Sequence, residues 1–200
     1  MYRYNATLLY IPAAVVWLIW LIYTVFFVQK KKTVSQIVLR SLTFAYIIMV
    51  LGVGLFPIQN YPLENPPGQN FIPFKTIVEL VTTLPAWIAT KQIVGNMLMF
   101  LPFGLLMPFY FSRHKFLKLL GTSALFSILI ESLQFTIGVL FVGSQYRVVD
   151  IDDVILNVVG AIIGFALYSL LPHKLKASLG KEVRRQRVQI YRPEIMFKKR

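Results

Sequence analysis

The side chains best suited to chemistry are acidic and amide groups near the end of an otherwise apolar stretch. Four of the eight acidic residues fall within positions 131–153, namely Glu131, Asp150, Asp152 and Asp153. An ionisable group at membrane depth costs roughly 2.5–3.5 kcal/mol, so such groups usually face protein or water and often mark function. This cluster is therefore the first candidate site.

Helical periodicity sorts these residues onto two faces. At 100° per residue, one stripe of about 80° holds Ser123, Ser127, Glu131, Gln134 and Gly138. A second stripe of similar width holds Asp150, Asp153, Asn157, Gly160 and Gly164, with Asp152 nearly opposite and therefore not included. The G-x-x-x-G spacing favours close approach of a neighbouring helix. We expect the two stripes to face each other, with Asn157 within reach of Gln134 or Glu131.

Asn96 precedes this region by one apolar segment and adds a further amide. The resulting hypothesis is one polar cavity lined by Asn96, Glu131, Gln134, Arg147, Asp150, Asp153 and Asn157. Structural alternatives stay open at this point. Asp150 would simply cap a helix, with Asp152 and Asp153 near its positive end and Arg147 neutralising them. Glu131 and Gln134 would simply join helices.

Five apolar segments position these residues. Helical crossing of a bilayer takes roughly 17 to 25 residues, and segments of that kind are Leu8–Val28, Ser41–Ile58, Gln92–Ser112, Phe116–Val142 and Asp153–Leu171. With 56% hydrophobic and 14% charged residues, the chain reads as an all-α, polytopic membrane bundle. It has no cysteine, which excludes disulfides and thiolate chemistry.

Basic residues predict the orientation. If the loops after the first and third segments and the C-terminal tail lie inside, 17 Lys and Arg are inside and 4 outside. The positive-inside rule then places the N-terminus outside, the C-terminus inside and the acidic cluster on the outer face. In the outer loop, Phe74 to Thr90 suits an interfacial or re-entrant segment or an ordinary surface loop. The basic tail suits anionic lipid headgroups, and nucleic acid is not an expected partner.

Three pieces of the sequence together resemble the VanZ-like family of bacterial membrane proteins. They are "NMLMFLPFG", "ESLQ" and "RVVDIDDVILNVVG", and "NFIPFKTI" at Asn70 to Ile77 resembles the family's outer-loop segment. The matching positions are Asn96, Phe100, Pro102, Gly104, Glu131, Gln134, Arg147, Asp150, Asp153, Asn157 and Gly160. The likeness covers about Gln69 to Leu171. It divides the chain into a two-helix region (1–68), a VanZ-like domain (69–172) and a basic cytoplasmic tail (173–200).

The resemblance implies a role in resistance to glycopeptide antibiotics, especially lipid-tailed teicoplanin, at the bacterial cell membrane. The expected partners are membrane lipids, a lipid-linked cell-wall precursor or the lipoglycopeptide itself. An alternative is a membrane enzyme with Glu131 as general acid or base and Asp150 and Asp153 holding a divalent cation. A transporter has less support, because no internal duplication is visible.

Overall fold

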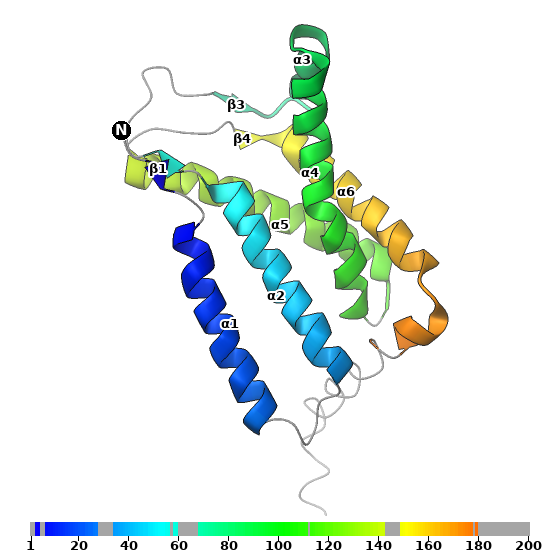
Figure 1. Cartoon of the computed structure of the whole chain (residues 1–200). Coiled ribbons are helices and arrows are strands. Elements are labelled where there is room, and N and C mark those ends of the chain that lie inside the picture. The colour runs from blue at the N-terminus through cyan, green and yellow to red at the C-terminus, as the bar shows by residue number, and fades with distance from the viewer. Residues whose placement is uncertain are drawn as a thin grey trace, which may run out of the picture.

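The protein is all-α, as the sequence predicts. The computed structural model describes residues 3–4, 7–27, 34–56, 58–59, 68–111, 113–142, 149–177 and 179. Its long helices are α1 (Thr7–Phe27), α2 (Val34–Leu55), α4 (Ala86–Leu106), α5 (Lys115–Ile137) and α6 (Ile151–Leu170). These helices form a bundle, and the shorter α3 (Lys75–Thr83) lies beside the beginning of α4 (Figure 1).

Two short irregular helices and four two-residue strands complete the described elements. A 3-10 turn, η1 (Met107–Phe109), continues α4, and a π-helical turn, η2 (Gly138–Val142), continues α5. β1 (Arg3–Tyr4) pairs antiparallel with β2 (Ile58–Gln59). β3 (Gln69–Asn70) pairs parallel with β4 (Val149–Asp150), which joins the outer loop to the start of α6.

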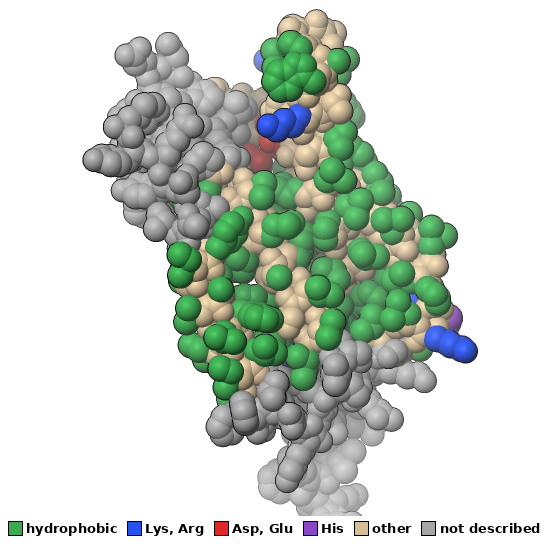
Figure 2. Space-filling view, in the orientation of Figure 1, with side chains coloured by type: hydrophobic (Ala, Val, Ile, Leu, Met, Phe, Trp, Pro, Cys, Tyr) green, Lys and Arg blue, Asp and Glu red, His purple; other side chains and the backbone are tan. Residues whose placement is uncertain are grey.

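Four described helical segments are long and apolar enough to cross a membrane. They are Ile37–Leu55, Ala86–Phe109, Lys115–Leu140 and Ile151–Leu170, and the apolar segment Leu9–Tyr23 of α1 is shorter. Figure 2 shows hydrophobic side chains over the flanks of these helices on the face in view. The protein is thus a multi-pass membrane protein. The fifth span and the orientation stay predictions.

The core lies where α2, α4 and α5 meet α6. Phe100, Phe103 and Phe126 form a ring cluster with centroids 5.6–5.7 Å apart. Ser123, Ser127, Glu131 and Gln134 are all buried, and Gly138 is buried as well. The polar stripe predicted for α5 therefore faces the protein interior, as its 3.6-residue period requires.

The closest helix contact joins α4 and α6. A Cβ on Gly160 would overlap the carbonyl oxygen of Met97, and one on Gly164 would overlap that of Leu101. Gly104 of α4 likewise lies directly on the carbonyl of Ala161. The G-x-x-x-G pattern does admit a close neighbour, but that neighbour is α4 rather than α5. We call this surface the glycine contact.

Candidate functional site

Asp150 is the residue immediately before α6 and lies outside the helix itself. Its φ and ψ of −131° and 124° are extended, and its Oδ1 accepts a hydrogen bond from the Asp152 N–H at 2.9 Å. This is the N-cap geometry that satisfies one of the free amides at a helix start. The capping alternative for Asp150 is thus realised, and the helical count through Asp150 was wrong because this residue lies outside the helix.

The cap has a second role, because the same oxygen binds the outer loop. Asp150 Oδ1 also accepts from Asn70 Nδ2 at 2.8 Å, and Asn70 Nδ2 donates to Thr76 Oγ1 at 2.9 Å. Asn70 Oδ1 accepts the Ile72 N–H at 3.1 Å. Asn70 and Asp150 are 8% and 3% exposed, so these polar groups are satisfied by each other rather than by solvent.

Asp152 holds the first turn of α3. Its Oδ1 accepts the Phe74 N–H, and its Oδ2 accepts the Ile77 N–H at 3.1 Å. Phe74 is at φ 65°, a left-handed conformation that non-glycine residues rarely adopt, so something must stabilise it. The Asp152 side chain is only 1% exposed. Asp152, which the sequence analysis left out of the candidate site, thus has a structural role beside it.

These contacts define what we call the acidic joint: Asn70, Asp150 and Asp152 together with the backbone N–H groups of Phe74 and Ile77. The joint ties β3 and α3 to the start of α6. A carboxylate at a helix N-terminus gains from both hydrogen bonds and the helix dipole, and Asp152 lies at the start of both α3 and α6. For Asn70, the sequence carried one signal, the likeness of "NFIPFKTI" to the family's outer loop.

The other predicted residues divide among three separate helix contacts. Asn96 Nδ2 on α4 donates to Asp153 Oδ1 on α6. Gln134 Nε2 on α5 donates to the Gly54 carbonyl at 2.7 Å, which satisfies one of the last carbonyls of α2. Asn157 Nδ2 on α6 donates to Ser127 Oγ on α5 at 2.8 Å.

Asn157 therefore does not reach Gln134 or Glu131, contrary to expectation. The two stripes do meet, but one helical turn deeper, at Ser127. Asn157 is 2% exposed, and among the described residues its Oδ1 has no hydrogen-bond partner. Arg147 lies outside the described residues.

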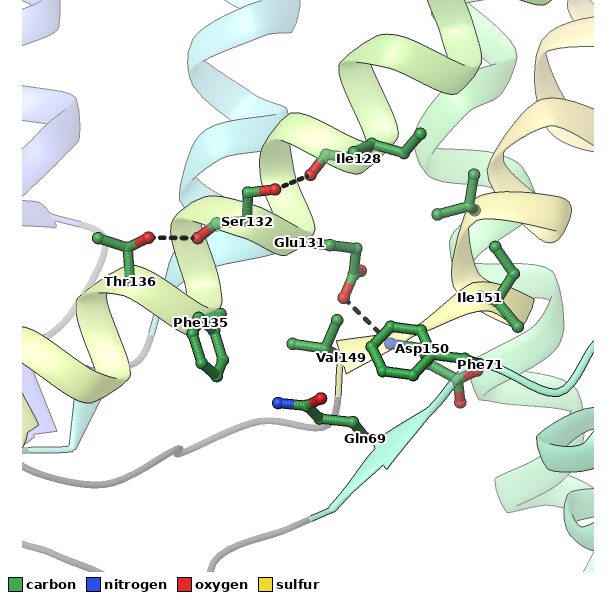
Figure 3. A pocket seen from close by; sticks show the side chains of 11 residues that line it. Gln69, Phe71, Ile128, Glu131, Ser132, Phe135, Thr136, Val149, Asp150 and Ile151 are labelled. Atoms are coloured by element: carbon green, nitrogen blue, oxygen red, sulfur yellow. Dashed lines mark hydrogen bonds between the residues drawn. The ribbon is translucent and has the colours of Figure 1, made fainter.

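A cavity of about 460 Å³ lies beside the acidic joint. Figure 3 shows the Glu131 side chain of α5 pointing toward the backbone of Asp150, where Glu131 Oε2 accepts the Asp150 N–H at 3.4 Å. Its lining residues are Gln69, Phe71, Ile128, Glu131, Ser132, Phe135, Thr136, Val149, Asp150, Ile151 and Val154. Most of this lining is apolar, and Glu131 and Asp150 are its acidic residues.

Of the six predicted lining residues that the structure describes, Glu131 and Asp150 lie on this cavity and the other four do not. The single polar chamber expected from the sequence is thus replaced by a mostly apolar cavity and by buried polar contacts between helices. Asn96, Gln134, Asp153 and Asn157 belong to those contacts. The physical reason is that amide and carboxylate groups within a bilayer satisfy one another wherever neighbouring helices allow it.

Metal binding by Asp150 and Asp153 stays a prediction. In the described part of the chain, no group of three or more histidine, aspartate or glutamate residues is placed to hold a metal ion. Asp150 Oδ1 already accepts two hydrogen bonds, and Asp153 Oδ1 accepts one from Asn96. A hard cation prefers six or more oxygen ligands, so further groups would have to join these two carboxylates.

The chain is similar to known proteins over most of its length. Residues 9–172 match the model of the VanZ/LLP1 family. Protein VanZ of Enterococcus faecium is 27% identical over 140 residues, which cover 68% of this chain and 76% of that protein. No solved structure matches the chain significantly. The matched region contains α2, α4, α5 and α6, α1 except for its first two residues, both strands of the β3–β4 pair and the cavity, and the chain belongs to the VanZ/LLP1 family.

Proposed function

We propose that this protein contributes to resistance against glycopeptide antibiotics of the teicoplanin class at the bacterial cell membrane. The family and the similarity to Protein VanZ support this role. The cavity beside Glu131 and Asp150 is the working site in this proposal. Its ligand is an amphiphile of the outer leaflet: a membrane lipid, a lipid-linked cell-wall precursor or the lipid-tailed drug.

The single observation that carries the proposal is the chemistry of the cavity wall. Phe71, Phe135, Ile128 and Val154 offer apolar surface for a hydrocarbon tail. Glu131 and Asp150 are the acidic residues among those that line this cavity, and a carboxylate accepts hydrogen bonds from a polar head. A ligand with both parts uses both surfaces, whereas a purely polar ligand would leave most of the wall without a partner.

Resistance measurements in cells expressing variants test the site. Glu131→Gln and Asp150→Asn keep side-chain size but remove the charge, and each is expected to abolish protection against teicoplanin while the protein still accumulates in membranes. Glu79→Gln is the matched control, because Glu79 is an exposed glutamate of α3 that does not line the cavity. Full protection by both cavity variants would refute the assignment. A glycopeptide without a lipid tail reports whether the tail matters.

The proposal includes five spans with the N-terminus outside and the C-terminus inside. Because the chain has no cysteine, single-cysteine variants give a clean assay. A cysteine at Val81 of α3 should react with a membrane-impermeant thiol reagent in intact cells. A cysteine at Lys118 of α5 should react only after permeabilisation, and the reverse pattern would invert the proposed orientation.

A further inference from the structure

A second cavity lies at the opposite end of the bundle from the acidic joint. It has a volume of about 360 Å³ and opens between α2 and the end of α4. Its lining residues are Arg40, Thr43, Phe44, Ile47, Met107 and Tyr110. None of these residues takes part in the proposed resistance site, so this cavity is independent of it.

The polar side of this cavity is an arginine next to two hydroxyl groups. Thr43 Oγ1 donates to the Leu39 carbonyl at 2.8 Å and lies 2.9 Å from the Tyr110 hydroxyl. Since the only proton on Thr43 Oγ1 is used, the Tyr110 hydroxyl is the donor to Thr43, and its own oxygen keeps acceptor capacity. Burial raises the pKa of Tyr110, while the Thr43 hydrogen bond and the nearby Arg40 charge oppose that rise.

The remaining wall of the cavity is apolar. Phe44 and Ile47 of α2 face Met107 of η1, and all three are half-buried. Arg40 precedes Phe44 by one helical turn on α2, so the guanidinium lies toward the end of the span and the apolar wall lies deeper. A charged group above a hydrocarbon surface matches the profile of a phospholipid in one leaflet.

The charge of the surroundings selects an anion. Arg40 shares this end of the bundle with the basic residues Arg113, Lys115, Lys118, Lys174 and Lys176. The acidic residues in the described part of the chain lie at the other end, on α3, the outer part of α5 and the start of α6. Basic pockets between membrane helices are established binding sites for acidic lipid headgroups.

We propose that this cavity binds an anionic phospholipid, with the phosphate on Arg40 and an acyl chain against Phe44, Ile47 and Met107. The guanidinium provides the planar, forked donor set that binds phosphate oxygens in pairs. The site would anchor α2 to the end of α4 in the leaflet at the basic end. We therefore expect this cavity to bind acidic lipids in preference to zwitterionic lipids, whether or not an antibiotic is present.

The test is lipid retention by the full-length protein reconstituted in vesicles of phosphatidylcholine with a minor fraction of phosphatidylglycerol. After extraction, native mass spectrometry counts each lipid that stays bound. Arg40→Gln should lower phosphatidylglycerol retention about tenfold, because a charge-assisted hydrogen bond is lost. Lys118→Gln is the matched control, since Lys118 is exposed at the same end and does not line the cavity.

Lipid retention at high salt distinguishes binding in the cavity from attraction to diffuse surface charge. At about 1 M salt the Debye length is about 3 Å, so the effect of Lys118→Gln should vanish while that of Arg40→Gln persists. Equal losses in both variants, or full retention by Arg40→Gln, would overturn the proposal. So would displacement of the lipid by inorganic phosphate, which would identify a phosphate site without a lipid requirement.

If Arg40→Gln fails to fold, Ile47→Trp provides the second route. Ile47 is a half-buried lining residue, and the larger ring should fill the apolar part of the cavity while Arg40 stays in place. Retention of phosphatidylglycerol should fall, and the midpoint of thermal unfolding in lipid-free detergent should not. Unchanged retention in this folded variant would equally overturn the proposal.

Discussion

The glycine contact and the acidic joint hold the same helix, α6, by opposite means. At the glycine contact, α6 lies against α4 with backbone on backbone, and no side chain intervenes at Gly160, Gly164 or Gly104. At the acidic joint, the start of α6 is held by carboxylates that accept N–H groups from β3 and α3. Lipid provides no hydrophobic driving force for helices to associate. Close packing therefore holds α6 within the membrane span, and hydrogen bonds to carboxylates hold it where the span begins.

The two contacts differ in the substitutions that they tolerate. The glycine contact allows no added atom, whereas the acidic joint depends on particular oxygen atoms and borders a cavity through Asp150. Disrupting the glycine contact should therefore separate α6 from α4 and destabilise the whole bundle. Disrupting the acidic joint should release the outer loop while the helices of the bundle stay packed.

The largest effect is expected from Gly160→Leu. The added side chain would overlap the Met97 backbone, which cannot move aside as a flexible side chain would. Overpacking usually costs about 1–3 kcal/mol, and we expect this variant to exceed the upper end of that range because the added side chain meets backbone rather than a movable side chain. The measurement is folded yield and thermal unfolding in detergent. Gly121→Leu on α5 is the control, because nothing lies within 4 Å of its added Cβ; equal damage there would contradict the packing argument.

Asp152→Ala should have the next largest effect, of about 3 kcal/mol, confined to the outer loop. It removes two charge-assisted hydrogen bonds to backbone N–H groups, and the side chain is buried. Hydrogen exchange should show lost protection over Lys75–Thr83 and unchanged protection in α4 and α6. Global loss of protection would show that the joint and the glycine contact are one cooperative unit.

The double variant Asn157→Leu/Ser127→Ala should be nearly neutral, within about 1 kcal/mol of the parent. It removes both partners of one hydrogen bond together with an amide oxygen that has no described partner, and replacing both partners by apolar groups costs little. Thermal unfolding measures stability, and teicoplanin susceptibility measures function. If the double variant is stable but no longer protects cells against teicoplanin, Asn157 belongs to the functional site.

The smallest effect is expected from Glu79→Gln, within about 0.5 kcal/mol. Its ion pair with Lys75 spans 4.0 Å between exposed side chains four residues apart, where solvent and salt screen the attraction. Unfolding at low and high salt is the appropriate measurement. A salt-sensitive loss of more than this in the free energy of unfolding would mean that α3 contributes more to the acidic joint than the Asp152 contacts explain.

Much of the architecture followed from the sequence. The first, fourth and fifth predicted segments agree with α1, α5 with η2, and α6 to within two residues at each end. The second and third helices begin earlier than predicted, at Val34 and Ala86. The predicted segments began only after polar residues inside these helices, Arg40 in α2 and Lys91 in α4, because a hydropathy criterion excludes such residues. The buried polar stripe on α5 was also predicted, since one face of a helix is fixed by its period.

Partner choice was not predictable in the same way. Hydrogen bonding between Asn157 and Ser127, or between Gln134 and Gly54, depends on the depth at which helices cross, and no local pattern encodes that depth. The role of Asp152 was missed because its partners lie on α3, more than seventy positions earlier in the chain.

The sequence alone determined the long helices apart from where α2 and α4 begin, together with their membrane character, the polar face of α5 and the family pattern. These features depend on residue type and short-range spacing. The tertiary structure decided which predicted residues border a cavity and which are satisfied by neighbouring helices. It placed Glu131 and Asp150 on one wall and assigned Asn96, Gln134, Asp153 and Asn157 to helix contacts. The physical reason is that a buried polar group must find a partner, and only the packing of distant segments determines which one is within reach.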